Sequence, residues 1–220
     1  MSIRGLVFDL DGTLVDSLDD ITFHLNHALA LAGLPPRDKA WARRNVGQGV
    51  AHLVRQALDV AAGRDREEAV LGVFVARYEA HPCDRTFPYP GVREALAACH
   101  ARGLVLAVLS NKPAGITVKV IEALGMAPLF RYVWGGDSFP ERKPSPLPLR
   151  HFLAEAGLAP SEALMVGDSA ADIQSARGAG VRSAFFPGGY GRLDGDAPAP
   201  DFILPSMSEL IPLLERLERG

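Results

Sequence analysis

The sequence predicts an α/β protein: a doubly wound parallel sheet forms the core, and a small all-helical segment is inserted into it. The main observation is a set of short apolar runs, rich in β-branched residues, that each end in a polar or glycine-bearing turn. These runs are Ile3–Phe8, Leu104–Leu109, Ala163–Val166, Val181–Phe186 and Phe202–Leu204. Because helical patterns separate most of them, we expect buried parallel strands in βαβ units.

Helical patterns lie between the later runs and end near glycine, the expected stop signal. The stretches with this pattern are residues 92–102, 114–124, 147–156 and 171–177. Ser206 and Glu209 have the spacing of a capping box, which predicts a last helix that runs to about Leu217.

One stretch departs from this alternation. From about residue 19 to residue 81 no strand is indicated, and apolar residues recur at helical intervals in three segments. The proline-rich stretch that follows, residues 81–91, is typical of a linker. We therefore expect a helical insert after the first strand. The predicted division is a core of residues 1–16 and 84–220 and an insert of residues 17–83.

The composition limits the classes of function. The chain has 220 residues, of which 48% are apolar and 22% charged, as in a globular protein with its own core. A net charge of −3 without a basic stripe argues against nucleic acid as a partner. No apolar run approaches the roughly 18 residues of a membrane span. Cys83 and Cys99 lack metal-ligand spacing, so we expect a reducing, cytoplasmic location.

Polar side chains follow three of the predicted strands. Asp9 follows the first, Ser110 the second and Asp168 a later one. Ligands of an open parallel sheet bind in the crevice outside the carboxyl ends of its strands. These three side chains, far apart in the sequence, should therefore converge on one edge of the sheet and form a polar site.

Asp9 and Asp11 are the strongest single sign of chemistry. In extended backbone, residues two apart point to the same side, and Gly12 lets a ligand approach the backbone closely. Two carboxylates behind an apolar strand are costly to desolvate and repel each other, so we expect a cation there. Together with Asp168, and with Asp172 as a further candidate, they form a set of oxygen ligands suited to Mg²⁺.

Four motifs, in order, resemble those of the haloacid dehalogenase superfamily of aspartate-nucleophile phosphotransferases. DLDGTLVDS at 9–17 resembles the first motif, SNK at 110–112 the second, Lys143 in ERKPSP the third, and GDSAAD at 167–172 the fourth. The resemblance implies a Rossmann-like core and makes the helical insert the small mobile cap of the family. Within the superfamily, NVGQGVAHLVRQAL at 45–58 is most similar to the cap of bacterial phosphoglycolate phosphatases.

The resemblance implies a Mg²⁺-dependent phosphatase for a small anionic phosphomonoester, with 2-phosphoglycolate as the first candidate substrate. In this interpretation Asp9 attacks phosphorus and forms an aspartyl-phosphate. Asp11 protonates the leaving alkoxide and then activates water. Asp9, the backbone carbonyl of Asp11, and Asp168 would hold Mg²⁺, with Asp172 behind these ligands.

The same resemblance assigns the phosphate contacts. Ser110 and backbone N–H groups near Asn111 would hold phosphate oxygens, and Lys143 would stabilise both the nucleophile and the transferring group. Substrate choice would fall to the cap, where the glycines on either side of Gln48 precede a helix and could offer N–H groups to an anion. Arg43, Arg44 and Gln48 are candidate contacts, although a surface helix explains both arginines equally well.

Each of these residues also has a commoner structural role. Asp9 or Asp11 alone could form a turn or cap a helix, but this explanation is poor for both acids behind an apolar strand. Ser110 with Asn111 could form a strand-ending turn, and Lys143 could be a solvated loop lysine. Asp168 could be a helix N-cap, and Asp172 could be a first-turn acid.

Other functions stay open within and outside the enzyme class. A phosphatase for another sugar phosphate or for pyrophosphate, or a phosphomutase of the same superfamily, would need the same motifs. A non-catalytic sensor or scaffold with this fold would be favoured by loss of the motif residues. All of them are present, which favours an enzyme whose partner is a small phosphorylated metabolite, with neither nucleic acid nor membrane involved.

Overall fold

A computed structural model describes residues 2–58, 63–191, 193 and 197–219. Within these ranges, six strands form one parallel sheet in the order β5-β4-β1-β6-β7-β8. They are β1 (Gly5–Phe8), β4 (Val105–Leu109), β5 (Tyr132–Trp134), β6 (Ala163–Gly167), β7 (Arg182–Phe185) and β8 (Phe202–Ile203). This sheet confirms the predicted doubly wound α/β core. The sequence patterns missed β5, a short edge strand whose residues are all half-buried.

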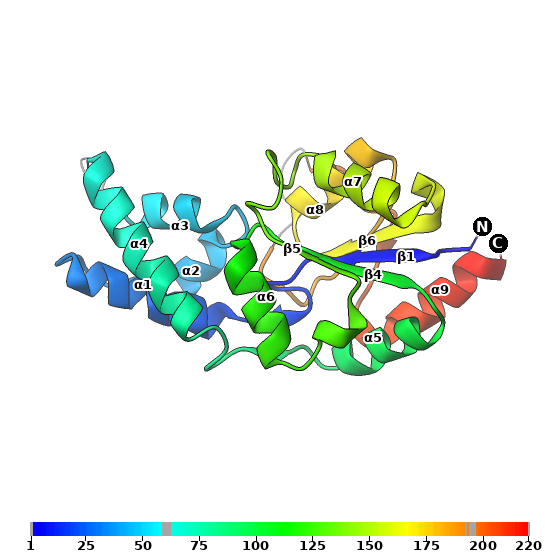
Figure 1. The fold of residues 1–220 in the computed structure, drawn as a ribbon, viewed down its shortest axis with the longest axis horizontal. Helices are drawn as coiled ribbons and strands as arrows, with labels where there is room; N and C mark the ends of the chain where they lie inside the picture. The colour runs from blue at the N-terminus through cyan, green and yellow to red at the C-terminus, as the bar shows by residue number, and fades with distance from the viewer. Residues whose placement is uncertain (1, 59–62, 192, 194–196, 220) are drawn as a thin grey trace.

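Helices cover both faces of the sheet (Figure 1). They are α5 (Val92–Ala101), α6 (Ala114–Ala123), α7 (Leu147–Ala156), α8 (Ala170–Ala179) and α9 (Leu210–Arg219). Successive residues of a strand point to opposite faces. Accordingly, Leu6 and Phe8 belong to the core that includes α5, α6 and α9, whereas Val7 packs with α7 and α8. Burial on both faces explains why β1 is apolar throughout.

The last helix begins differently from the prediction. A 3₁₀ turn, Met207–Glu209, precedes α9, and the side chain of Ser206 makes no capping hydrogen bond. The Oγ atom of Ser206 instead lies 2.7 Å from that of Ser208. The predicted capping box is therefore wrong, because Glu209 lies in the 3₁₀ turn rather than in the first turn of the α-helix.

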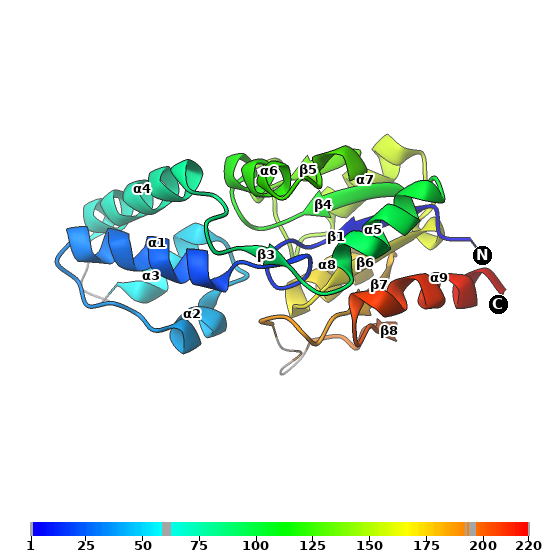
Figure 2. The same cartoon turned by 90° about the horizontal axis from the view of Figure 1, so that it is seen from below.

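In the inserted segment, the described residues 17–58 and 63–83 form four helices, which lie beyond the carboxyl ends of the strands (Figures 1 and 2). They are α1 (Leu18–Leu31), α2 (Lys39–Asn45), α3 (Val50–Ala57) and α4 (Arg64–Ala80). The apolar face of α1, which includes Leu25 and Leu29, packs with Phe74 of α4, and all three side chains are fully buried. Each such burial stabilises the fold by roughly 1.5–3 kcal/mol. The sequence patterns missed α2, since Ala42 is its one buried residue.

The two connections to this segment lie side by side. Strand β2 (Val15–Asp16) pairs antiparallel with β3 (Phe87–Pro88). At the end of the second connection, the buried Asp20 carboxylate accepts hydrogen bonds from the backbone N–H of Arg85 and the hydroxyl of Thr86. The insert therefore enters and leaves the core through one short ribbon.

The start of α1 is fixed by the loop after β7. The hydroxyl oxygen of Tyr190 accepts hydrogen bonds from the backbone N–H groups of Ser17 and Leu18, at 2.6 and 3.0 Å. The same hydroxyl donates to the Asp16 carboxylate at 2.7 Å. Free N–H groups at a helix start need such partners, so this phenol serves as the cap of α1.

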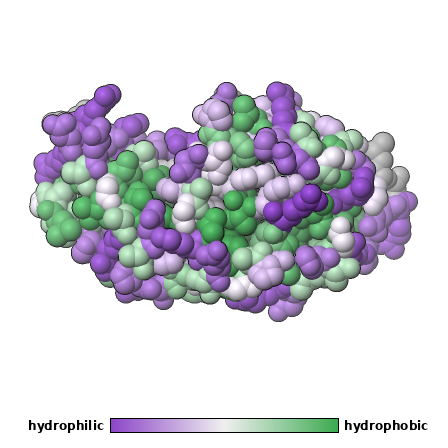
Figure 3. All heavy atoms as spheres, in the orientation of Figure 1, coloured by the Kyte–Doolittle hydropathy of each residue, from purple (hydrophilic) through white to green (hydrophobic). Residues whose placement is uncertain are grey.

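The surface is mixed in character. Figure 3 shows apolar and polar residues interspersed over both the helical segment and the core. In the described part of the chain, no helix is both long enough and apolar enough to cross a membrane.

The Tyr190 cap generates a stability prediction. We expect Tyr190→Phe to lower the free energy of unfolding by about 1–3 kcal/mol, because the buried Ser17 N–H loses its acceptor and the Leu18 N–H keeps only the Asp16 carboxylate, at 3.2 Å. Urea denaturation measures this change. Tyr132→Phe is the matched control, since it removes an exposed hydroxyl that donates to the Glu155 carbonyl. Equal, small effects of both substitutions would contradict the capping role.

Candidate active site

Three adjacent strands bring the predicted polar residues together. Asp9 follows β1, Ser110 follows β4 and Asp168 follows β6, and β1 lies between the other two strands in the sheet. All three side chains are buried. Their positions agree with the rule that ligands of an open parallel sheet bind outside the carboxyl ends of the strands.

A pocket lies between this edge of the sheet and the helical segment. The core contributes a polar wall, formed by Asp9, Asp11, Ser110, Asn111 and Lys112. The helical segment contributes a mostly apolar wall, formed by Ile21, Val46, Gly47, Gly49, Val50, Leu53, Phe74 and Tyr78. A pocket with one polar wall and one apolar wall suits a small ligand that has one strongly polar end.

Lys143 joins two carboxylates at the bottom of the site. Its ammonium lies 2.8 Å from Oδ1 of Asp9 and 2.7 Å from Oδ1 of Asp172, and its side chain is 2% exposed. Burial alone would lower the pKa of Lys143, but the charges of Asp172 and Asp9 outweigh it and raise the pKa above its ordinary value. The two carboxylates therefore favour the charged form of the lysine.

Different parts of the surroundings of Asp9 shift its pKa in opposite directions. Burial raises the pKa of Asp9 well above its ordinary value, and the neighbouring charges of Asp172 and Asp168 raise it further. The Lys143 ammonium opposes this shift. A further cation at the site would favour the ionised, nucleophilic form of Asp9.

Asp168 is held by main-chain donors of a loop that the sequence patterns did not single out. Its Oδ2 atom accepts the N–H groups of Tyr190 and Gly191 at 2.7 and 2.9 Å, and its Oδ1 atom accepts the hydroxyl of Thr13 at 3.3 Å. Burial and the charge of Asp172 outweigh these bonds and raise the pKa of Asp168 to about 6. A Cβ atom on Gly189 would overlap the Asp168 carboxylate, so glycine is required at this close approach.

Carboxylate oxygens of Asp9, Asp168 and Asp172 lie within 4.8 Å of one another. Asp172 already uses both of its oxygens, one with Lys143 and the other with the N–H and hydroxyl of Ser169. Three buried acids around one described ammonium leave negative charge uncompensated. This donor set therefore fits a hard divalent cation that binds oxygen. Asp168, like Asp172, accepts hydrogen bonds at both of its oxygens, so these bonds do not decide which of the three acids would hold the ion.

Asp11 has a cation of its own. The ammonium of Lys112 lies 2.9 and 3.0 Å from the two carboxylate oxygens of Asp11 and 2.7 Å from the Tyr78 hydroxyl. The Ser17 hydroxyl also donates to Asp11, at 2.5 Å. Lys112 was not among the predicted site residues, although it follows Ser110 and Asn111 directly at the end of β4, and that position was the available signal.

Ser110 and Asn111 line the pocket, but the Asn111 side chain is turned away from a ligand role. Its Nδ2 atom donates to the carbonyls of Gly47 and Lys143, at 2.9 and 3.0 Å. Its Oδ1 atom is buried without a hydrogen-bond partner among the described residues. The amide thus ties the helical segment to the loop that carries Lys143.

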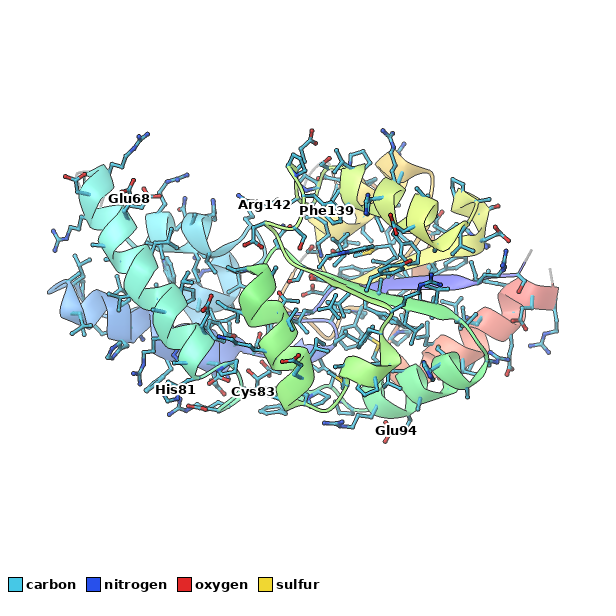
Figure 4. All side chains as sticks on the ribbon, in the orientation of Figure 1. Glu68, His81, Cys83, Glu94, Phe139 and Arg142 are labelled. Atoms are coloured by element: carbon cyan, nitrogen blue, oxygen red, sulfur yellow. The ribbon has the colours of Figure 1, made fainter. Side chains whose placement is uncertain are left out.

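The predicted specificity residues lie elsewhere. Among the described residues, Arg43, Arg44 and Gln48 are exposed, and none of them lines the pocket. The Arg43 guanidinium donates to the Gly189 carbonyl and lies over the Tyr190 ring, 5.8 Å from its centroid. Arg142, on the loop before α7 (Figure 4), lies instead against Gly49 at the pocket.

The sequence of the chain is similar to those of known proteins. Residues 6–186 match the model of the haloacid dehalogenase-like hydrolase family. The chain is 39% identical to a phosphoglycolate phosphatase of Chromobacterium violaceum and 37% identical to one of Aquifex aeolicus, with 97% of each chain covered in both cases.

Solved structures show the same relationship. A crystal structure described as a predicted phosphoglycolate phosphatase from Haemophilus somnus superimposes with a TM-score of 0.91 at 32% identity, covering 97% of this chain and 98% of that one. A structure of CbbY from Rhodobacter sphaeroides in complex with phosphate gives 0.76 at 27% identity, covering 94% and 96%. The chain belongs to the haloacid dehalogenase-like hydrolase family.

Proposed function

We propose that the protein is a Mg²⁺-dependent phosphatase that hydrolyses a small anionic phosphomonoester, with 2-phosphoglycolate as the first candidate, through an aspartyl-phosphate. The observation that carries the proposal is the buried Asp9 carboxylate, which is paired with Lys143. Asp9 and Asp11 both belong to the polar wall of the pocket. The names of the relatives support the substrate.

The two acids divide the chemistry between them. A carboxylate oxygen of Asp9 bonds to phosphorus while the bond from phosphorus to the alcohol oxygen breaks, and Asp11 gives its proton to that oxygen. Asp11, now a carboxylate, takes a proton from water. The water oxygen then bonds to phosphorus, which releases Asp9 and inorganic phosphate.

The acid cluster is the proposed Mg²⁺ site. Asp9 and Asp168 would hold the ion by their side chains and Asp11 by its backbone carbonyl, while Asp172 orients Lys143 from behind. When bound, Mg²⁺ would offset the repulsion between the nucleophile and the phosphate dianion. Ser110, the backbone at Asn111, and Lys143 would bind the phosphate oxygens.

The remainder of the pocket supports a short anionic substrate. The apolar wall from the helical segment offers few polar groups to a large sugar. The guanidinium of Arg142 lies beside Gly49 of this wall and supplies positive charge next to the pocket, whereas the charge of Lys112 is taken up by Asp11. A sugar phosphate is the second candidate, because a CbbY structure that is 25% identical to this chain is described as a complex with xylulose-1,5-bisphosphate.

The division into a core of residues 1–16 and 84–220 and a cap of residues 17–83 is part of the proposal. It is supported by the β2–β3 ribbon, which carries both connections at these boundaries. A reducing, cytoplasmic environment is also proposed, in keeping with the free thiols of Cys83 and Cys99.

Asp9→Asn tests the mechanism. We expect kcat to fall by about 10⁴-fold or more, because the amide is not a nucleophile and keeps the shape of the side chain. Phosphate release from 2-phosphoglycolate measures the loss, and circular dichroism checks the fold. Asp65→Asn, at an exposed acid of α4, is the matched control and should leave turnover unchanged. Near-native hydrolysis by Asp9→Asn would refute the mechanism.

A substrate panel tests the specificity. We expect kcat/KM for 2-phosphoglycolate to exceed that for sugar phosphates, nucleotides and pyrophosphate by about tenfold or more, because Arg142 beside the pocket favours a short anionic leaving group and the apolar wall offers few polar groups to a larger one. Initial rates of phosphate release provide the comparison. Equal, weak activity on all members of the panel would refute this substrate and leave the reaction class intact.

The pKa of Asp168 predicts how metal affinity depends on pH. Mg²⁺ binds the ionised carboxylate, so protons compete with it as the pH falls through about 6. We expect the Mg²⁺ dissociation constant, measured by titration calorimetry, to be about tenfold weaker at pH 5 than at pH 7.5. Asp168→Asn should lose most of the binding at both pH values, and Asp9, whose pKa is also raised, acts in the same direction as Asp168 in the unmodified protein. A constant that is unchanged or tighter at pH 5 would contradict the assignment of this ligand.

A further inference from the structure

A second buried ion pair in the site has no role in the mechanism above. The Lys112 side chain is 2% exposed and its ammonium contacts both oxygens of Asp11. An ammonium has three N–H donors. The third is satisfied by the hydroxyl of Tyr78, whose ring also lies 4.2 Å from the nitrogen.

These contacts cross from the core to the helical segment. Asp11 and Lys112 follow β1 and β4 of the sheet, whereas Tyr78 belongs to α4. Tyr78 is fully buried, with the rings of Phe74 and His24 against it at 5.7 and 4.6 Å. Because its neighbours fix the ring, its hydroxyl presents a rigid acceptor to Lys112.

We propose that Lys112 and Tyr78 are positioning residues for Asp11. Charge-assisted hydrogen bonds to both oxygens fix the plane of Asp11 in its carboxylate form, the form that takes the proton from water in the second step. In the first step Asp11 carries a proton on one oxygen, Lys112 keeps its bond to the other, and the O–H must lie within hydrogen-bonding reach of the leaving oxygen. Because Tyr78 comes from α4, Asp11 is held correctly when the helical segment is docked on the core. The inference rests on the acid role proposed for Asp11.

The consequence depends on the leaving group. An alkyl phosphate needs a proton on its alcohol oxygen as the bond to phosphorus breaks, whereas 4-nitrophenolate is stable enough to leave without one. A displaced Asp11 should therefore slow the cleavage of alkyl phosphates and leave the aryl phosphate almost unaffected. The ratio kcat/KM is the relevant quantity, because it covers the steps up to release of the alcohol.

The experiment compares three substrates: 2-phosphoglycolate, ethylene glycol phosphate, which lacks the carboxylate, and 4-nitrophenyl phosphate. We expect Lys112→Met to lower kcat/KM for both alkyl phosphates by about 10²–10³-fold and for the aryl phosphate by about threefold or less. Tyr78→Phe, which removes one oxygen atom, should give about a tenfold loss with the same selectivity. Lys112→Arg should restore part of the alkyl activity.

Two control substitutions distinguish the positioning of Asp11 from a general effect of docking the helical segment on the core. Lys119 of α6 forms an exposed ion pair with Glu79 of α4, at 3.5 Å, and so joins core and helical segment without touching Asp11. Lys119→Met should leave all three substrates unchanged. Tyr132→Phe controls for loss of a tyrosine hydroxyl far from the pocket.

Several results would overturn the inference. Equal losses on all three substrates would show a structural role, and a loss confined to 2-phosphoglycolate would show that Lys112 binds its carboxylate instead. A selective loss in Lys119→Met would assign the effect to docking alone. If Lys112→Met fails to fold, Tyr78→Phe carries the same test. Failure of the proposed function would look different, since Asp9→Asn would then remain active or the unmodified enzyme would cleave none of the three substrates.

Discussion

The buried ammonium of Lys143 is the interaction on which the site depends. It lies between Asp9 at the end of β1 and Asp172 in the first turn of α8, and so joins three separate segments of the core. Removing one member of such a buried pair costs about 3–5 kcal/mol, because the remaining charge has no partner. Asn111 binds the carbonyl of Lys143 and holds its loop in place. One lysine therefore holds two of the three acids of the cluster, and the loop after β7 holds the third.

Two acids that are two residues apart avoid mutual repulsion by pairing in different directions. Asp9 pairs with Lys143 inside the core, and Asp11 pairs with Lys112 at the boundary with the helical segment. The surroundings of the nucleophile are thus complete in the core alone, whereas those of the proton donor include Tyr78 of α4. The sequence analysis expected a metal ion at the two acids and Lys143 beside the nucleophile, and the structure adds Lys112 as the partner of Asp11.

The sequence patterns predicted the features that residues close together in the sequence determine. Burial on both faces makes β1 an uninterrupted apolar run, and the position of Asp9 directly after it marked the site. Strand β5 and helix α2 were missed because neither buries enough side chains to produce a pattern. The contact between Lys112 and Asp11 spans 101 residues and that between Tyr190 and Ser17 spans 173, so no local pattern could reveal either partnership.

The β2–β3 ribbon has a consequence for how this architecture can vary. Both ends of the helical segment leave the core at neighbouring points, and the chain entropy lost in closing such an insert rises by only about 0.6 kcal/mol for each doubling of its length. The sheet does not need a particular number of helices between those two points. The insert can therefore be shortened, lengthened or exchanged as a module while β1 and Asp9 keep their places, and the contact of Lys112 with Tyr78 is what couples the chemistry of Asp11 to the insert.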